Sequence, residues 1–331
     1  MAGMNQGMNV LQALNAAMAW EMEHDPDVIL LGEDVGVAGG IFRVTRGLQN
    51  RFGRDRVIDT PLDEKGIAAH AVGLAMAGMK PVAEIQFSGF IHDAHEQIMF
   101  CGAKMRWMTG GEYSCPMVIR APSYGGIMGG FWHSQSIESY YIHGGGIKIV
   151  SPSTPRDAYG LMLAAIRDPD PVLVIEPVPL YRAAPQDVED NGEALPIGPG
   201  EIVREGSDVT VVTYGPLRHQ LVQLADPLSD EGIEAEVIDL KTLIPYDLEL
   251  IVESVNKTGR LVIVHEASET LGFGAELAAQ VQKRCFGYLE APIERICAPD
   301  VPYSYRVGDE YFKPNAARIR AGIRRTMEFT F

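Results

Sequence analysis

Apolar residues in the first part of the chain follow two patterns that alternate along it. Val10 to Glu23 has the 3.6-residue spacing of an amphipathic helix. Short apolar runs predict buried strands at Asp27 to Gly36, Lys80 to Phe87 and Pro116 to Arg120, with a long helix from Ile91 to Trp107 between the last two. Strands that alternate with helices predict a mostly parallel sheet covered by helices on both faces.

A polar and acidic segment interrupts this alternation past the middle of the chain. Ala183 to Gly200 is rich in proline and glycine, which is typical of a linker between domains. Beyond it strands and helices alternate again, up to a helix predicted at Gly274 to Arg284. We therefore predict an α/β fold of two domains, residues 1–185 and 201–331, joined by a linker at 186–200.

Composition narrows the range of partners. The 331 residues are 46% hydrophobic and 22% charged, as in an ordinary globular protein, and the net charge is −16. Nucleic acids and anionic membrane surfaces attract basic patches, so we expect neither as a partner. No run of about 18 apolar residues predicts a membrane span, and the N-terminus lacks the pattern of a secretion signal. The four cysteines have no metal-site spacing, so we expect reduced thiols in a cytoplasmic protein.

An acid stands where a strand meets a helix in the stretch Asp59 to Gly78. Pro61 ends the strand because it has no N–H to donate, and small and apolar residues predict a closely packed helix from Gly66 onward. Glu64 lies between them and is expected to be half-buried, which is costly for a carboxylate unless it has a partner or a catalytic task. The alternative is an acid of the first helical turn that the helix dipole favours.

A second candidate lies in a segment with four glycines, Gly125, Gly126, Gly129 and Gly130. We expect this segment to be a loop without regular structure, and His133 follows it directly after two aromatic residues. A histidine in such a place can act as a general acid and base near neutral pH. The alternative is a histidine that only caps the loop.

Metal sites are predicted only weakly. His92 and His95 are three residues apart on a predicted helix, but no third ligand has a recognisable spacing. Asp168 and Asp170, with the carbonyls of Ala165 and Ile166, form an oxygen-rich helix end that could hold a hard cation, although most such turns only end a helix.

Several stretches taken together resemble the β subunit of the E1 component of 2-oxo acid dehydrogenase complexes, which are thiamine-diphosphate enzymes. The resemblance runs in collinear order over nearly the whole chain and is more specific than any single motif. The matching stretches are LGEDVG at Leu31 to Gly36, GGIFRVTRGL at Gly39 to Leu48, DTPLDEKGI at Asp59 to Ile67, AEIQF at Ala83 to Phe87, HSQSIE at His133 to Glu138, IKIVSPSTPRDA at Ile147 to Ala158, EPVPLYR at Glu176 to Arg182, and VIDLKTLIPYD at Val237 to Asp247.

The resemblance implies a pyrimidine-binding domain followed by a transketolase C-terminal domain. It implies that Glu64 contacts N1′ of the aminopyrimidine of thiamine diphosphate and helps the cofactor to lose its proton. His133 is implied to act in substrate binding and in acyl transfer to the lipoamide of E2. The other cofactor-binding residues implied are Leu62, Gln86, Phe90 and Glu33; the oxygen-rich helix end at Ala165, Ile166, Asp168 and Asp170 is the place of a potassium ion.

The sequence departs from the family in two respects. Phe90 stands where the family usually has a tyrosine, so a hydroxyl contact to the cofactor is lost. His92 and His95 lie in a segment that is normally apolar and aromatic. Lys65 is expected to lower the pKa of its neighbour Glu64 if its side chain points inward.

A missing motif predicts a partner chain. The GDG motif with a downstream asparagine, which binds magnesium and the diphosphate in thiamine enzymes, does not occur in the 331 residues. The resemblance therefore implies that an E1 α subunit supplies the magnesium site and half of the cofactor site, in an α2β2 heterotetramer that works with the E2 lipoyl acyltransferase.

The expected activity is the oxidative decarboxylation of branched-chain 2-oxo acids such as 2-oxoisovalerate, an oxidoreductase reaction with lipoamide as acceptor. Pyruvate or acetoin dehydrogenase is the alternative within the class. A scaffold subunit that docks E2 without catalysis is an alternative of another class, which the presence of Glu64 and His133 disfavours. A self-sufficient transketolase-like enzyme needs the missing diphosphate motif.

Overall fold

A computed structural model describes residues 5–305 and 311–330. The chain forms two compact units. The first contains the residues up to Ser123 together with Tyr140–Ile197, and the second contains Tyr124–Ser139 and the residues from Gly198 onward. The predicted boundaries at 185 and 201 remain a prediction.

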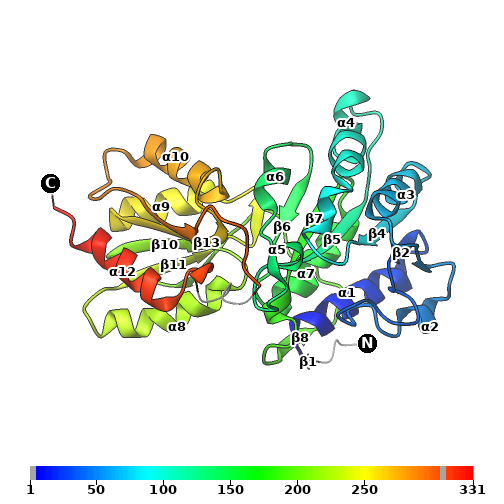
Figure 1. Cartoon of the computed structure of the whole chain (residues 1–331), viewed down its shortest axis with the longest axis horizontal. Coiled ribbons are helices and arrows are strands. Elements are labelled where there is room, and N and C mark those ends of the chain that lie inside the picture. Colours follow the sequence, from blue (N-terminus) through cyan, green and yellow to red (C-terminus); the bar gives the residue numbers. More distant parts are fainter. Residues whose placement is uncertain (1–4, 306–310, 331) are drawn as a thin grey trace. The chain divides into compact units, whose positions relative to one another are not determined.

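The first unit is built on a parallel sheet, as the apolar runs predicted. Its strands lie in the order β6-β7-β5-β4-β2-β3 (Figure 1). They are almost entirely buried, which explains why they are apolar on both faces. Their bounds are β2 Val28–Gly32, β3 Val57–Asp59, β4 Lys80–Glu84, β5 Val118–Ser123, β6 Lys148–Val150 and β7 Val172–Pro177.

Helices α1 (Val10–His24) and α7 (Pro155–Arg167) pack against each other in this unit. Asn9 begins α1 with a capping box, in which its side chain accepts a bond from Gln12 N and the Gln12 side chain accepts one from Asn9 N. Helices α2 (Leu48–Phe52) and α3 (Glu64–Met76) each connect two strands. Part of the predicted linker, Gln186–Glu189, forms strand β8 and pairs antiparallel with β1 (Asn5–Met8).

The prediction of one regular helix from Ile91 to Trp107 was wrong. Instead a 3₁₀ turn η1 (Phe90–His92), a π-helical segment η2 (Gln97–Gly102) and a short helix α4 (Met105–Met108) follow one another. The wide π turn brings Gly102 so close to Met117 that a Cβ at Gly102 would lie 2.3 Å from the methionine Cε. A π turn of this kind often marks a functional region of a fold.

The second unit has a sheet in the order β14-β13-β10-β11-β9, in which β9 alone runs antiparallel to its neighbour. Helices α8 and α12 cover one face of this sheet, and α9 and α10 cover the other (Figure 1). The short strand β12 (Thr242–Ile244) follows β11. The other bounds are β9 Glu201–Arg204, β10 Val209–Thr213, α8 Leu217–Ser229, β11 Ala235–Asp239, α9 Leu248–Thr258, β13 Leu261–Ser268, α10 Phe273–Cys285, β14 Glu294–Ala298 and α12 Ala316–Met327.

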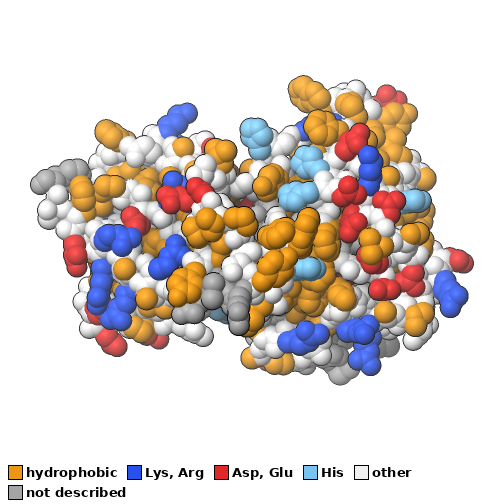
Figure 2. All heavy atoms as spheres, in the orientation of Figure 1, with side chains coloured by type: hydrophobic (Ala, Val, Ile, Leu, Met, Phe, Trp, Pro, Cys, Tyr) orange, Lys and Arg blue, Asp and Glu red, His pale blue; other side chains and the backbone are white. Residues whose placement is uncertain are grey.

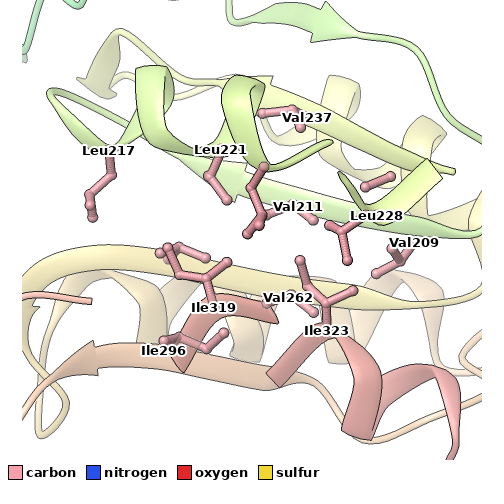
Figure 3. Packing of buried hydrophobic residues seen from close by; sticks show 13 residues of the cluster. Val209, Val211, Leu217, Leu221, Leu228, Val237, Val262, Ile296, Ile319 and Ile323 are labelled. Carbon is pink, nitrogen blue, oxygen red and sulfur yellow. The ribbon is translucent and has the colours of Figure 1, made fainter. Parts of the chain in front are cut away.

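The core of the second unit lies between the sheet and the pair α8 and α12 (Figure 3). Leu217 and Leu221 of α8 and Ile319 and Ile323 of α12 pack there on apolar side chains of the strands, among them Val211. At about 25 cal/mol per Å² of buried apolar surface, such packing is the main favourable contribution to folding of this unit.

Charged side chains of both signs lie on the surface (Figure 2). Figure 2 shows acidic and basic side chains interspersed on the face it displays. In the parts of the chain that the structure describes, no helix is both long and apolar enough to cross a membrane. All four cysteines are free thiols, and only Cys101 is exposed.

Candidate active site

The carboxyl ends of three neighbouring strands meet at one edge of the first unit's sheet. Gly32 at the end of β2 pairs with Glu84 of β4, and Glu84 pairs in turn with Arg120 of β5. Ligands of open parallel sheets bind outside this edge. Two of the residues predicted to bind the cofactor, Glu33 and Gln86, follow β2 and β4 at this edge and are half-buried there.

Glu64 reaches the same edge from the next strand. Thr60 N donates a hydrogen bond to Gly32 O at 2.9 Å, which ties the segment after β3 to the end of β2. Asp63 is the N-cap of α3, and its Oδ1 accepts from Gly66 N at 2.9 Å. Glu64 is therefore the first residue of the helix, half-buried, and is not needed as its cap.

Two carboxylates lie close together here. Burial raises the pKa of Glu33, and the negative charges of Glu64 and Asp34 raise it further. The Lys65 side chain does not point inward to compensate the charges of Glu33 and Glu64. Its ammonium pairs instead with Glu96 on the surface, at 3.1 Å. A pair of half-buried acids whose neighbouring lysine pairs elsewhere suits a ligand that brings a proton or a positive charge.

The remaining predicted cofactor residues differ in their surroundings. Phe90 belongs to an aromatic cluster, in which its ring centroid lies 6.0 Å from that of Phe87, and Phe87 lies 5.4 Å from Phe42. The Phe90 ring is thus held among other aromatic side chains of the first unit. Leu62 is 73% exposed, so its side chain makes little contact within this chain.

A buried charge network, which the sequence analysis missed, lies at the same sheet edge. The Arg120 guanidinium donates to Glu84 Oε2 at 2.5 Å and to both oxygens of Glu176 at 2.6 and 2.9 Å. The Tyr181 hydroxyl also donates to Glu176. All four side chains are buried, and Tyr181 also packs on Phe42 with centroids 5.4 Å apart. The sequence signal was a charged residue inside each of three apolar strands.

Electrostatics in this network are asymmetric. Two carboxyl groups share one guanidinium, and Arg120 bonds Glu176 through two nitrogens but Glu84 through one. Burial and the charge of Glu176 raise the pKa of Glu84, although Arg120 opposes them. Both carboxylates raise the pKa of Arg120 despite its burial, so the guanidinium stays charged.

His133 belongs to the second compact unit, whereas Glu64 belongs to the first. The segment around it was predicted to lack regular structure, but it contains the short helices α5 (Gly130–His133) and α6 (Glu138–Ile142). His133 is half-buried, and its Nδ1 lies 2.9 Å from Gly129 O. Because a carbonyl only accepts, Nδ1 carries the proton, and Nε2 is the basic nitrogen of the neutral ring.

The residues of the predicted cation site lie together at the end of α7, but its two aspartates form ion pairs with basic side chains. Lys148 Nζ donates to both oxygens of Asp168, and Arg106 Nε donates to Asp170 Oδ1 at 2.7 Å. Ala165 and Ile166 are buried in the last turn of the helix. Among residues 5–305 and 311–330, no three His, Cys, Asp or Glu side chains form a metal-binding group. Potassium binding remains a prediction that depends on backbone carbonyls.

The two unexplained histidines pack on tyrosine rings. His92 lies with its centroid 4.7 Å from Tyr140, and His95 lies 5.2 Å from Tyr141. Burial lowers the pKa of His95, and the charge of His92 lowers it further. The two rings therefore take the place of apolar and aromatic side chains in this segment.

Comparisons with known proteins cover nearly the whole chain. The model of the transketolase pyrimidine-binding domain matches residues 6–184, and that of the transketolase C-terminal domain matches residues 198–319. The chain is 45% identical to the mitochondrial 2-oxoisovalerate dehydrogenase subunit beta of Dictyostelium discoideum, over 99% of this chain and 89% of that protein.

Two bacterial relatives from Bacillus subtilis align over 97% of this chain and 99% of their own length. The 2-oxoisovalerate dehydrogenase subunit beta is 44% identical, and the pyruvate dehydrogenase E1 component subunit beta is 41% identical. A solved structure described as a split gene transketolase, inactive beta4 tetramer, has a TM-score of 0.78 at 21% identity, over 97% of this chain and 99% of its own. That likeness concerns the fold.

Proposed function

Because the chain belongs to the transketolase-like family of E1 β subunits of 2-oxo acid dehydrogenases, we propose that it is the β subunit of a branched-chain 2-oxo acid dehydrogenase. The reaction is the oxidative decarboxylation of 2-oxoisovalerate and related acids, with acyl transfer to the lipoamide of an E2 partner. The observation that carries the proposal is the pair of half-buried acids Glu33 and Glu64 at the sheet edge of a pyrimidine-binding domain.

The residues at this edge fit the aminopyrimidine half of thiamine diphosphate. Glu64 begins α3, and the neighbouring Lys65 pairs with Glu96 on the surface, so the Glu64 carboxylate is suited to accept a hydrogen bond from a protonated ring nitrogen. Phe90 and Phe87 offer aromatic surface for a flat ring. The cofactor, when bound, would supply the electron sink that decarboxylation of a 2-oxo acid requires.

The chain's own groups have separate tasks in this proposal. Glu64 holds or releases a proton at the ring nitrogen, and burial together with the charge of Glu64 raises the pKa of the nearby Glu33. His133 exchanges a proton through Nε2 with the substrate or the incoming dithiolane. Both assignments follow the family resemblance at the matching positions.

A partner chain completes the site in this proposal. The absent GDG motif leaves the diphosphate and magnesium without their usual ligands in the 331 residues, so an α subunit supplies them in an α2β2 assembly. The proposal also includes a potassium ion at the end of α7, held by Ala165, Ile166, Asp168 and Asp170. It further includes a cytoplasmic location. Pyruvate is the second candidate substrate, because a pyruvate dehydrogenase relative is nearly as similar.

Calorimetric titration with thiamine diphosphate and magnesium tests the need for a partner. We expect no micromolar binding to this chain alone and clear binding to the chain assembled with its α subunit. The matched control is the same assembly with Glu64→Gln, which keeps the diphosphate ligands and should bind more weakly. Micromolar binding by the lone chain would contradict the shared site.

A further inference from the structure

We infer that three side chains of the second unit, Glu266, Tyr305 and Tyr214, are positioning residues that hold the His133 segment in one conformation. This inference rests on the proposed function of His133. The segment from Gly125 to Glu138 contains four glycines, so it has little intrinsic preference for one backbone conformation. Contacts outside the segment must therefore define where the histidine lies.

The first anchor is Glu266 of β13 at the start of the segment. Its side chain is buried at 4% exposure, and Oε2 accepts a hydrogen bond from Gly125 N at 3.0 Å. Tyr124, directly before this glycine, has a positive φ of 73° and donates through its N–H to Gln135 O at 3.3 Å. The Tyr124–Gln135 hydrogen bond therefore joins the two ends of the loop, next to the place where Glu266 binds Gly125.

The second anchor is the ring of Tyr305, which contacts the segment at two residues shortly before the histidine, Gly130 and Phe131. Gly130 has a φ of +64°, and a Cβ there would lie 2.3 Å from Tyr305 Cε1. Phe131 packs edge to face on the same ring, with centroids 5.9 Å apart. Glycine is therefore required at position 130 both for its φ and for the close approach of the ring.

The third anchor is Tyr214, which binds Glu138, a residue that follows the histidine in the chain. Its hydroxyl donates to Glu138 Oε1 at 2.6 Å, and both side chains are fully buried. Within the described residues the other oxygen, Glu138 Oε2, has no hydrogen-bond partner. Tyr214 stacks on His265 with centroids 5.9 Å apart, and this contact fixes its ring. A buried carboxyl group whose second oxygen lacks a partner depends strongly on the bond from Tyr214.

Replacing Tyr214 tests the inference because Tyr214→Phe removes the hydroxyl and keeps the ring. In the assembly with the α subunit, we expect acyl transfer to a lipoyl domain to fall about tenfold and decarboxylation with an artificial electron acceptor to fall less. Glu138→Gln is the matched control: its amide oxygen still accepts from the Tyr214 hydroxyl, so acyl transfer should stay within about threefold of wild type.

A double-mutant cycle separates positioning from general damage. If Tyr214 acts through His133, Tyr214→Phe should cause no further loss of acyl transfer in a His133→Ala background. An equal loss in both backgrounds would overturn the inference, since it means that Tyr214 acts on something else.

Hydrogen exchange supplies a readout that is independent of activity. In the same assembly, Tyr214→Phe should speed amide exchange across residues 125–138 and leave the strands of the second unit unchanged. Unchanged exchange in this segment would also overturn the inference. Failure of the proposed function is distinguishable, because it would appear as absent decarboxylation by the wild-type assembly while the exchange result still stood.

Discussion

Removing the guanidinium of Arg120 is the sharpest test of the buried network at the sheet edge. The side chain is fully buried and is bonded to two carboxyl groups, Glu84 and Glu176. Breaking a buried ion pair by removing one partner costs about 3–5 kcal/mol of stability, because the other charge is left uncompensated. We therefore expect Arg120→Met to lower the free energy of unfolding by about that amount.

Two companion variants isolate the charge effect from packing. Glu84→Gln keeps an acceptor for the Arg120 guanidinium and leaves one carboxylate for one cation, so its cost should be about 1 kcal/mol or less. Replacing all three groups by apolar side chains (Glu84→Leu, Arg120→Met, Glu176→Leu) should restore much of the stability lost in Arg120→Met.

Urea unfolding of the full chain, followed by circular dichroism, measures these differences. The midpoint of the first unfolding transition should move to a lower urea concentration in Arg120→Met and stay near the wild-type value in Glu84→Gln. Equal stability of Arg120→Met and wild type would refute the reasoning, because the guanidinium would then not be compensating buried charge.

Three further results are expected. Glu64→Gln in the assembly with an α subunit should leave the fold intact and lower the steady-state turnover by roughly 10²-fold or more, and an unchanged rate would return Glu64 to the role of a first-turn acid. His133→Ala should damage acyl transfer to lipoamide at least as much as decarboxylation with an artificial acceptor; wild-type rates in both assays would exclude a catalytic role. Burial lowers the pKa of His265 to about 4, so the unfolded chain binds this proton more readily between about pH 6.5 and 4. Stability should therefore fall by about 3 kcal/mol as the pH drops through this window, and a urea series on His265→Gln should lack this component.

The alternation of strands and helices was predictable because buried parallel strands require continuous apolar runs. Helix α12 was not predicted, since its two core residues, Ile319 and Ile323, stand among four arginines and only the folded sheet shows them as buried. The π-helical break near Gly102 depends on a contact with Met117, which no local pattern records.

The candidate site was predictable in part. Glu64 was singled out by its place between a strand and a helix, whereas Glu33 and Phe90 came from the family resemblance. The structure adds that burial and the charge of Glu64 raise the pKa of Glu33. The bonds of Arg120 to Glu84 and Glu176 join residues 36 and 56 positions apart, so they follow from strand order and register and from no spacing in the sequence. For the same reason, the anchors of His133 could not be predicted.

Decarboxylation by the reconstituted enzyme tests the central claim most directly. The chain is assembled with its α subunit, thiamine diphosphate and magnesium, and kcat/KM is measured for 2-oxoisovalerate and for pyruvate. We expect carbon dioxide release only when both subunits are present, with 2-oxoisovalerate preferred by at least about tenfold. A preference for pyruvate would reassign the substrate within the family, and equal turnover by the lone chain, or none by the assembly with either acid, would contradict the account.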